Sequence, residues 1–268
     1  MTNPMQCKYI YVVWTSILLS LILVCCSSNG ANDQGEIFIK VVDAPANYQQ
    51  INIVVDHVSI HQIGSIGWTF ISTSKVQFDL LKQINGNSVQ LVLSKVPVGT
   101  YDRIKIDYGT CTITAEGIEH YLNLDASIQN GNTIPYNFQI TDGQMYQLTF
   151  DYDAYSSVYV SGVSYNNYYF KPIIRVQNTL LSGSITGTVR DSNNFVASAK
   201  ITTYTELDTV KTYNDTTYGS FQLSDLPEGK YTVIVIPYNQ LLMNDTIPDT
   251  VVIRQRTTKL GIIKLKYR

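Results

Sequence analysis

Apolar and polar residues alternate with a period of two through most of the chain after residue 35, which predicts half-buried β-strands. The clearest case is residues 103–108, where Ile104, Ile106 and Tyr108 share one side and three charged residues share the other. A second segment, residues 146–153, repeats the arrangement with a largely aromatic apolar side. Helical periodicity is almost absent. The pattern therefore predicts antiparallel sheets that pack on one face and meet water on the other.

The alternation slips by one residue near the start of this region. Residues 51–55 place apolar side chains at odd positions, whereas Val58 and Ile60 place them at even positions. An extra residue that keeps both halves on the core is a β-bulge, and we expect one at Asp56 and His57.

Shorter signals break up the strands. Residues 85–87 (NGN) and 96–101 (VPVGTY) carry residues typical of turns, and a short helix is predicted over residues 79–82.

The N-terminal segment is typical of an export signal. Residues 10–24 form an apolar run preceded by Lys8, and the run is shorter than the roughly 20 residues that a membrane-spanning helix needs. It therefore fits the apolar core of a signal peptide. The alternatives are an uncleaved N-terminal membrane anchor and a signal peptide that is cut elsewhere.

The end of this segment resembles a bacterial lipobox, with Leu23 at the aliphatic position and Cys25 at the small position before Cys26. The resemblance implies cleavage before Cys26 and a diacylglycerol group on its thiol. Acyl chains stabilise membrane attachment by about 0.8 kcal/mol per buried methylene, so two or more chains anchor a protein stably.

The composition argues against nucleic-acid binding and against an internal disulfide. The chain has 268 residues and a net charge of −2, with charged residues at only 15%, and it contains no basic run that could bind a nucleic-acid backbone. Cys111 is the only cysteine outside the N-terminal segment, so no internal disulfide is expected. It alternates in phase with Ile113 and Ala115, which predicts a buried, unreactive thiol.

Motifs along residues 36–177 resemble the family known as domain of unknown function 4382. The matching segments are residues 41–48 (VVDAPANY), 58–61 (VSIH), Trp68, 78–81 (FDLL), 96–101 (VPVGTY), 150–154 (FDYDA) and 171–176 (KPIIRV). The resemblance implies an all-β domain found in exported lipoproteins, and it carries no established activity.

The remaining residues resemble a carboxypeptidase regulatory-like domain with a transthyretin-like fold. The matching positions are Gly187, Val189, Asp191, Gly219, Phe221, Leu226, Pro227, Gly229 and Tyr231. Residues 194–199 lack the usual proline, and the turn over residues 214–219 is longer than usual. The resemblance implies an accessory domain, grouped with carbohydrate-binding-like folds, in which Gly219 permits a tight turn.

These observations predict an all-β protein with two β-sandwich-like domains in tandem after a cleaved lipoprotein signal peptide. We assign the signal peptide to residues 1–25, a flexible tether to 26–35, the first domain to 36–177, a linker to 178–182 and the second domain to 183–268.

Three histidines and two aspartates are the candidates for metal or acid–base chemistry. His57 and His61 lie four residues apart, but on a strand with no third ligand nearby, so both are expected to be exposed strand residues, and His120 likewise. Asp151 and Asp153 share one strand face and are candidates for a Ca²⁺ site; a solvated polar face is the alternative.

Tyrosines are concentrated near the end of the first domain. Tyr152, Tyr155, Tyr159, Tyr165, Tyr168 and Tyr169 are interleaved with serine, asparagine and glycine. Aromatic rings flanked by amides and hydroxyls suit sugar stacking or adhesive contact, so the candidate ligand-binding residues are Tyr165, Asn166, Tyr168 and Tyr169. The alternative is that half of these rings fill the core and the rest shield a hairpin.

The sequence shows no motif typical of a nucleophile elbow, a phosphate-binding loop or a zinc protease. We therefore predict a non-enzymatic lipoprotein of the cell envelope, anchored in the outer membrane and facing either the periplasm or the exterior, without catalytic residues or cofactor. Its expected role is binding or adhesion, with a glycan or surface protein as partner. The alternatives are a structural subunit joined to others by β-strand pairing and a metal-dependent hydrolase.

Overall fold

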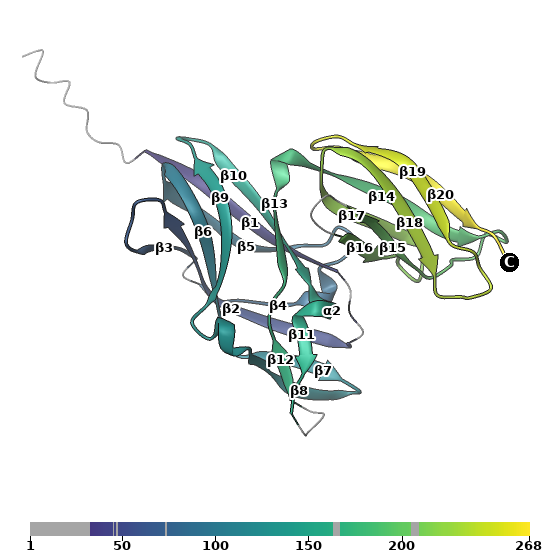
Figure 1. Cartoon of the computed structure of the whole chain (residues 1–268), viewed down its shortest axis with the longest axis horizontal. Helices are drawn as coiled ribbons and strands as arrows, with labels where there is room; N and C mark the ends of the chain where they lie inside the picture. Colours follow the sequence, from purple (N-terminus) through teal and green to yellow (C-terminus); the bar gives the residue numbers. More distant parts are fainter. Residues whose placement is uncertain (1–32, 45, 47, 73, 163–166, 205–208) are drawn as a thin grey trace, which may run out of the picture. The chain divides into compact units, whose positions relative to one another are not determined.

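The computed structural model describes residues 33–268 except 45, 47, 73, 163–166 and 205–208. Cys26, Tyr165 and Asn166 lie outside the described residues. Residues 34–268 form one compact unit, and strands dominate it, which confirms the predicted all-β fold (Figure 1). Among the described residues, no helix has both the length and the apolar character that crossing a membrane requires.

The first region of the unit, strands β1 to β13, contains two sheets. One has the order β13-β10-β1-β5, and the other has the order β11-β12-β8-β7-β2-β6-β9, with β3 and β4 also paired to β2. The elements are β1 (Gln34–Ala44), β2 (Gln50–Gln62), β3 (Trp68–Ser72), β4 (Val76–Asp79), η1 (Leu80–Lys82), β5 (Val89–Pro97), β6 (Gly99–Tyr108), β7 (Cys111–Ala115), β8 (Ile118–Leu124), η2 (Ala126–Ile128), β9 (Asn132–Ile140), β10 (Met145–Asp153), α2 (Ala154–Ser157), β11 (Val158–Val160), β12 (Tyr168–Phe170) and β13 (Ile174–Asn178).

The second region, strands β14 to β20, also contains two sheets, with the orders β17-β14-β20 and β16-β15-β18-β19. Its elements are η3 (Thr179–Leu181), β14 (Ser182–Asp191), β15 (Ala199–Tyr204), β16 (Thr209–Tyr213), β17 (Ser220–Pro227), β18 (Gly229–Pro237), β19 (Asp245–Val252) and β20 (Thr257–Leu265). Each region has its own hydrophobic core. The exact domain boundaries stay a prediction.

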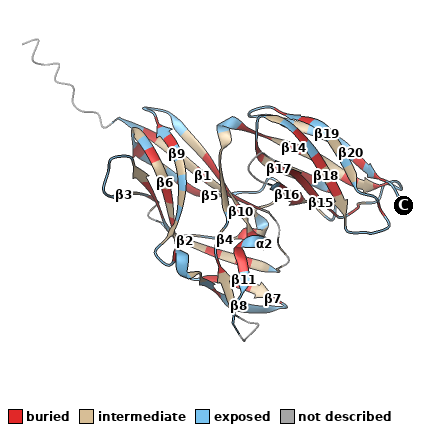
Figure 2. Cartoon of the chain, viewed as in Figure 1, coloured by how far each residue is buried: buried red, intermediate tan, exposed pale blue. Residues whose placement is uncertain are grey.

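The alternating pattern produces the first core as expected. Buried and less buried positions alternate along β6 (Figure 2). Ile104, Ile106 and Tyr108 are buried, while the charged residues between them are partly exposed. The pairing of β2 with β6 shifts register between Val55 and His57, which confirms the β-bulge. η1 forms at the predicted place, because the Asp79 side chain accepts a hydrogen bond from the Leu81 amide.

One face of β10 departs from the prediction of a solvated side. Thr149 is fully buried, and its hydroxyl donates a 2.8 Å hydrogen bond to Asp225 of the second region. On the same side, Arg175 makes a 2.6 Å ion pair with Asp151 and donates from Nη1 to the Asp225 carbonyl at 3.2 Å. The alternation of β10 was read correctly, but its polar side is largely covered by protein: Thr149 is buried, and the side chains of Asp151 and Asp153 are only 17% and 29% exposed.

Both regions contain a hairpin turn with the sequence Pro-X-Gly-X-Tyr, which we call the tyrosine corner: residues 97–101 and residues 227–231. At the β5–β6 turn, the Tyr101 hydroxyl donates to the Pro97 carbonyl at 2.8 Å. At the β17–β18 turn, the Tyr231 hydroxyl donates to the Pro227 carbonyl at 2.7 Å. Each tyrosine therefore ties the end of one strand to the start of the next.

Gly219, two residues before Phe221, lies at a position that only glycine can occupy. Gly219 has φ +77°, and a Cβ placed there would lie 2.7 Å from the Val189 carbonyl oxygen. Only glycine satisfies both the left-handed conformation and this close approach.

Candidate functional site

An exposed aromatic face covers one end of the nine-stranded sheet, on strands β7, β8, β11 and β12. Side chains of these strands alternate between the core and solvent. Cys111, Leu122 and Phe170 point into the core. The opposite side, which we call the aromatic face, carries Thr112, Tyr121, Asn123, Tyr159 and Tyr169.

The registers of these strands bring the outward side chains together. Tyr159 lies opposite Tyr169, and their rings stack with centroids 5.4 Å apart and planes 17° apart. Tyr169 lies beside Asn123 on the parallel strand β8. Tyr121, two residues before Asn123, is paired with Thr112 and is 73% exposed. Tyr159 is 38% exposed, so the face presents rings, an amide and a hydroxyl to solvent.

Asp125, at the end of β8, holds Tyr159 in place. It accepts hydrogen bonds from the Ser127 hydroxyl and amide and from the Tyr159 hydroxyl. The bonds from Ser127 and then Tyr159 lower the pKa of Asp125 to about 2. The same hydrogen bond raises the pKa of Tyr159, because ionisation would place two anions side by side. The ring orientation is therefore stable over the physiological pH range.

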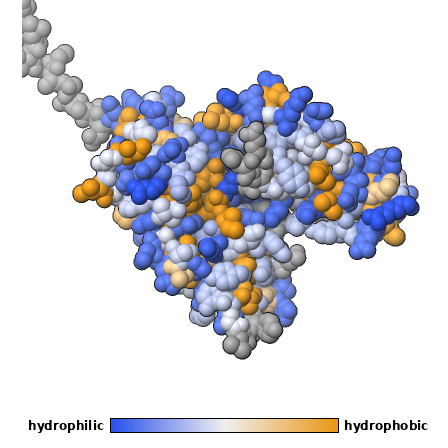
Figure 3. Space-filling model, in the orientation of Figure 1, coloured by the Kyte–Doolittle hydropathy of each residue, from blue (hydrophilic) through white to orange (hydrophobic). Residues whose placement is uncertain are grey.

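This arrangement suits the recognition of a flat ligand with an apolar side and polar edges. Tyrosines supply large rigid contact area with few rotatable bonds, and neighbouring amides and hydroxyls supply hydrogen bonds. Side chains of intermediate and hydrophilic character cover most of the surface around β8 and β12, at the bottom of the view in Figure 3. A pyranose ring fits this description, since its axial C–H groups form an apolar face.

The structure separates the tyrosines of the predicted cluster. Tyr155 is 61% exposed, and the Lys211 ammonium lies 5.7 Å from the centre of its ring. Tyr152 is fully buried, with its hydroxyl 2.9 Å from that of Tyr108. Tyr168 lies on the inner side, where its ring contacts those of Tyr48 and His120 at 6.3 and 5.1 Å. Tyr169 belongs to the aromatic face, and the placement of Tyr165 and Asn166 is not described.

Three residues of the aromatic face were missed by the sequence analysis: Thr112, Tyr121 and Asn123. Tyr121 and Asn123 alternate with the core residue Leu122 on β8. That alternation indicates that both side chains face outward. It cannot show that β12 pairs with β8 and places Tyr169 beside Asn123.

The two aspartates considered for Ca²⁺ each face a cation of the protein. Asp151 pairs with Arg175, and Asp153 pairs with Lys211 at 3.0 Å. Burial raises the pKa of Asp153, but hydrogen bonds from Lys211 and Ser156 outweigh this, and the pKa lies below its ordinary value. The residues that the structure describes contain no group of three or more potential metal ligands. Both carboxylates therefore lie beside a cation of the protein itself.

The three histidines and Cys111 differ in their exposure. His57 is exposed, as predicted, and its ring contacts Phe70. The expectation that His61 is exposed was wrong: its side chain is 12% exposed, and Nδ1 lies 2.7 Å from Asp102. His120 is partly buried rather than exposed. Cys111 is buried as predicted, and burial raises the pKa of its thiol to about 11.

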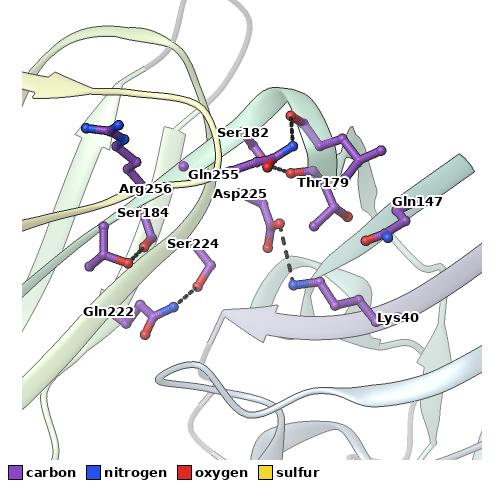
Figure 4. Close-up of a pocket in the computed structure, with 13 residues that line it drawn as sticks. Lys40, Gln147, Thr179, Ser182, Ser184, Gln222, Ser224, Asp225, Gln255 and Arg256 are labelled. Atoms are coloured by element: carbon purple, nitrogen blue, oxygen red, sulfur yellow. Dashed lines mark hydrogen bonds and ion pairs between the residues drawn. The ribbon is translucent and has the colours of Figure 1, made fainter. Parts of the chain in front are cut away.

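A polar pocket of about 380 Å³ lies beside Asp225, between strands of the two regions (Figure 4). The Asp225 carboxylate accepts from Thr149 and lies 3.6 Å from the Lys40 ammonium. Several lining groups bond to one another: Ser184 with Thr257, Gln222 with Ser224, and Gln255 with the Leu180 carbonyl. This pairing makes the pocket a polar joint, whereas the aromatic face leaves rings open to solvent.

Comparison with known proteins identifies one family. The family described as "Domain of unknown function (DUF4382)" matches residues 34–172. No curated protein matches the chain.

Some solved structures resemble the chain distantly. The TIE protein of Bacillus anthracis aligns over 94% of this chain and 44% of its own, with 10% identity and a TM-score of 0.28. The minor pilin GBS52 of Streptococcus agalactiae aligns over 86% and 96%, with 9% identity and a TM-score of 0.27. The major pilin subunit BcpA of Bacillus cereus aligns over 88% and 71%, with 13% identity and a TM-score of 0.25. The chain thus spans less than half of the TIE protein.

Proposed function

Because the chain belongs to the family described as domain of unknown function (DUF4382), whose description gives no activity, we propose a function from the site itself. The protein is a non-enzymatic, lipid-anchored protein of the cell envelope, and its first region binds glycans through the aromatic face. The observation that carries this proposal is the stacked pair Tyr159 and Tyr169 beside Asn123 and the exposed ring of Tyr121.

The shallow aromatic face favours weak binding of each glycan and a multivalent attachment by many copies of the protein. Ring contacts contribute about 0.5–1.5 kcal/mol each, so a few rings and hydrogen bonds reach the roughly 4 kcal/mol of a millimolar complex. Many copies on one surface raise the effective affinity by about 10²–10⁴ without new contacts. An anchored protein with a shallow aromatic face is therefore suited to adhesion.

The anchor is the second part of the proposal. The lipobox-like sequence before Cys26 supports acylation of that thiol. Residues 183–268, which resemble a carboxypeptidase regulatory-like domain, would act as an accessory spacer. The lipobox-like sequence and the two β-sheet regions fit a protein that is attached to the outer membrane.

A glycan array probed with residues 27–268 tests the binding. We expect Tyr159→Ala and Tyr169→Ala each to weaken binding about 5-fold or more, as loss of about 1 kcal/mol per ring requires. Tyr218→Ala is the matched control, because Tyr218 is 71% exposed but lies in the second region. Absence of binding to any glycan, or equal losses in all three variants, would contradict the proposal. Mass spectrometry of the protein from cells tests the anchor separately.

A second candidate function is a structural subunit of a surface assembly. It is favoured by an open groove of about 370 Å³ between β5, an edge strand, and strands β3 and β4. Phe70 and Leu93, which line the groove, are 57% and 54% exposed. An added strand could cover these side chains and pair with the free edge. Cross-linking in cells distinguishes the two: a ladder of higher species favours assembly, and a monomer argues against it.

A further inference from the structure

The loop between β2 and β3 exposes two isoleucines. Ile63 is 57% exposed and Ile66 is completely exposed. The loop is nevertheless held in shape. The Ile63 amide donates to the Thr100 carbonyl at 2.9 Å, and the Ser65 amide donates to the Gln62 carbonyl at 3.0 Å. The isoleucines are thus presented to solvent by a turn that backbone hydrogen bonds hold in place.

The base of the loop combines an indole ring with cationic groups. Trp68 directly follows the loop, and the Arg103 guanidinium and the Lys105 ammonium lie 5.5 and 5.3 Å from the centre of its ring. Arg103 also contacts His61 and Asp102. Lys105 lies 3.7 Å from the Asp107 carboxylate, so the two cations at Trp68 each have an acidic neighbour. An apolar tip beside a Trp and two cationic groups matches the order of environments at a lipid surface, from acyl chains through the interface to headgroups.

The loop lies at the end of the first region where β1 begins. Gln34, the first residue of β1, is paired with Pro97. The β5–β6 turn follows Pro97 and leads to Thr100, which contacts Ile63. The start of β1 and the isoleucine loop are therefore separated only by this turn.

We propose that Ile63 and Ile66 insert shallowly into the lipid bilayer that carries the anchor, with Trp68 at the interface and Arg103 and Lys105 near anionic headgroups. The inference rests on the proposed acylation of Cys26. Seven residues, 27–33, separate that thiol from β1, and a chain of this length spans at most about 25 Å. The end of the first region that carries the loop therefore stays within reach of the bilayer.

Tryptophan fluorescence of residues 27–268 tests the insertion, because Trp68 is the only Trp of this fragment. The fragment contains the whole compact unit of residues 34–268. Vesicles of phosphatidylethanolamine and phosphatidylglycerol should shift the Trp68 emission to shorter wavelength and sediment the protein. The double variant Ile63→Ser, Ile66→Ser should lose both effects. The matched control is Ile118→Ser, Ile262→Ser, since those side chains are 59% and 57% exposed elsewhere; it should behave as the unaltered fragment.

Three outcomes would overturn the inference. One is an unchanged emission and no sedimentation of the correctly folded fragment. The second is an equal loss in both double variants. The third is a blue shift that follows protein concentration without vesicles, which would assign the loop to a second copy of the chain. Because the fragment lacks Cys26, the result does not depend on acylation in cells. Glycan binding by the isoleucine variant should be unchanged, which separates this test from that of the aromatic face.

Discussion

The two regions of the molecule close a hairpin with the same Pro-X-Gly-X-Tyr corner, yet they use it in different surroundings. Tyr101 is fully buried, and its ring stacks on Phe138 at 5.1 Å. Tyr231 is 8% exposed. In both corners the tyrosine hydroxyl donates to the proline carbonyl.

The larger difference lies outside the corners. The first region extends one of its sheets with β7, β8, β11 and β12, which carry the aromatic face, and it presents the isoleucine loop between β2 and β3. The corner is thus a structural device that both regions share. The features that suit binding are found where the first region departs from the second.

Truncating the two corner tyrosines should produce the largest difference between the regions. We expect Tyr101→Ala to lower the free energy of unfolding by about 3–5 kcal/mol, because it removes a fully buried, stacked ring. Tyr231→Ala should cost less, since that ring is slightly exposed. Urea denaturation measures both, and equal losses would contradict this comparison.

Removing the Asp225 carboxylate should weaken the joint between the regions. We expect Asp225→Ala to cost about 1–3 kcal/mol, because the buried Thr149 hydroxyl loses its carboxylate acceptor and keeps only Thr179, and Lys40 loses its partner. Asp249→Ala is the control: its ion pair with Lys230 is exposed, and it should show no measurable change. If the two variants unfold alike, the joint contributes nothing to stability.

Removing only the corner hydroxyls should show what the regions have in common. Tyr101→Phe and Tyr231→Phe should each cost about 1 kcal/mol, the net value of one hydrogen bond. Differential scanning calorimetry measures the loss. A cost at one corner alone would show that the corners are not equivalent.

In the fragment of residues 27–268, Cys111 is the only cysteine and provides a probe of the first region alone. Because burial raises its thiol pKa to about 11, the thiol is protonated at neutral pH and should not react with a thiol reagent until the first region unfolds. The labelling rate, followed against urea concentration, should track the loss of β-sheet circular dichroism. Rapid labelling of the folded protein would contradict the buried placement.

Glycan binding should be insensitive to mild acid. The folded pKa of Asp125 is lowered to about 2, so its stabilising contribution is present above the unfolded pKa and is lost as the pH falls through the folded value. Binding should therefore hold from about pH 8 to about pH 4. A loss of binding near pH 6 in array measurements would show that another group controls the face.

Much of the fold could be read from local patterns. The bulge at Asp56 and His57 followed from side-chain parity, and η1 formed within the residues predicted for a short helix. The polar side of β10 was misread, because alternation separates two faces without saying what covers either. His61 was misread for the same reason, since its partner Asp102 comes from the neighbouring strand β6.

The sequence by itself determined the all-β fold and the turns, because alternation, proline and glycine constrain the backbone over a few residues. It also determined the family, because the matching motifs are short segments of the chain. Only the tertiary structure decided which tyrosines face solvent. Tyr152, Tyr168 and Tyr169 belong to the same tyrosine cluster of the sequence. Strand pairing nevertheless places the first in the core, the second on the inner side and the third beside Asn123. That choice depends on register between strands distant in sequence, and register is set by the whole core at once.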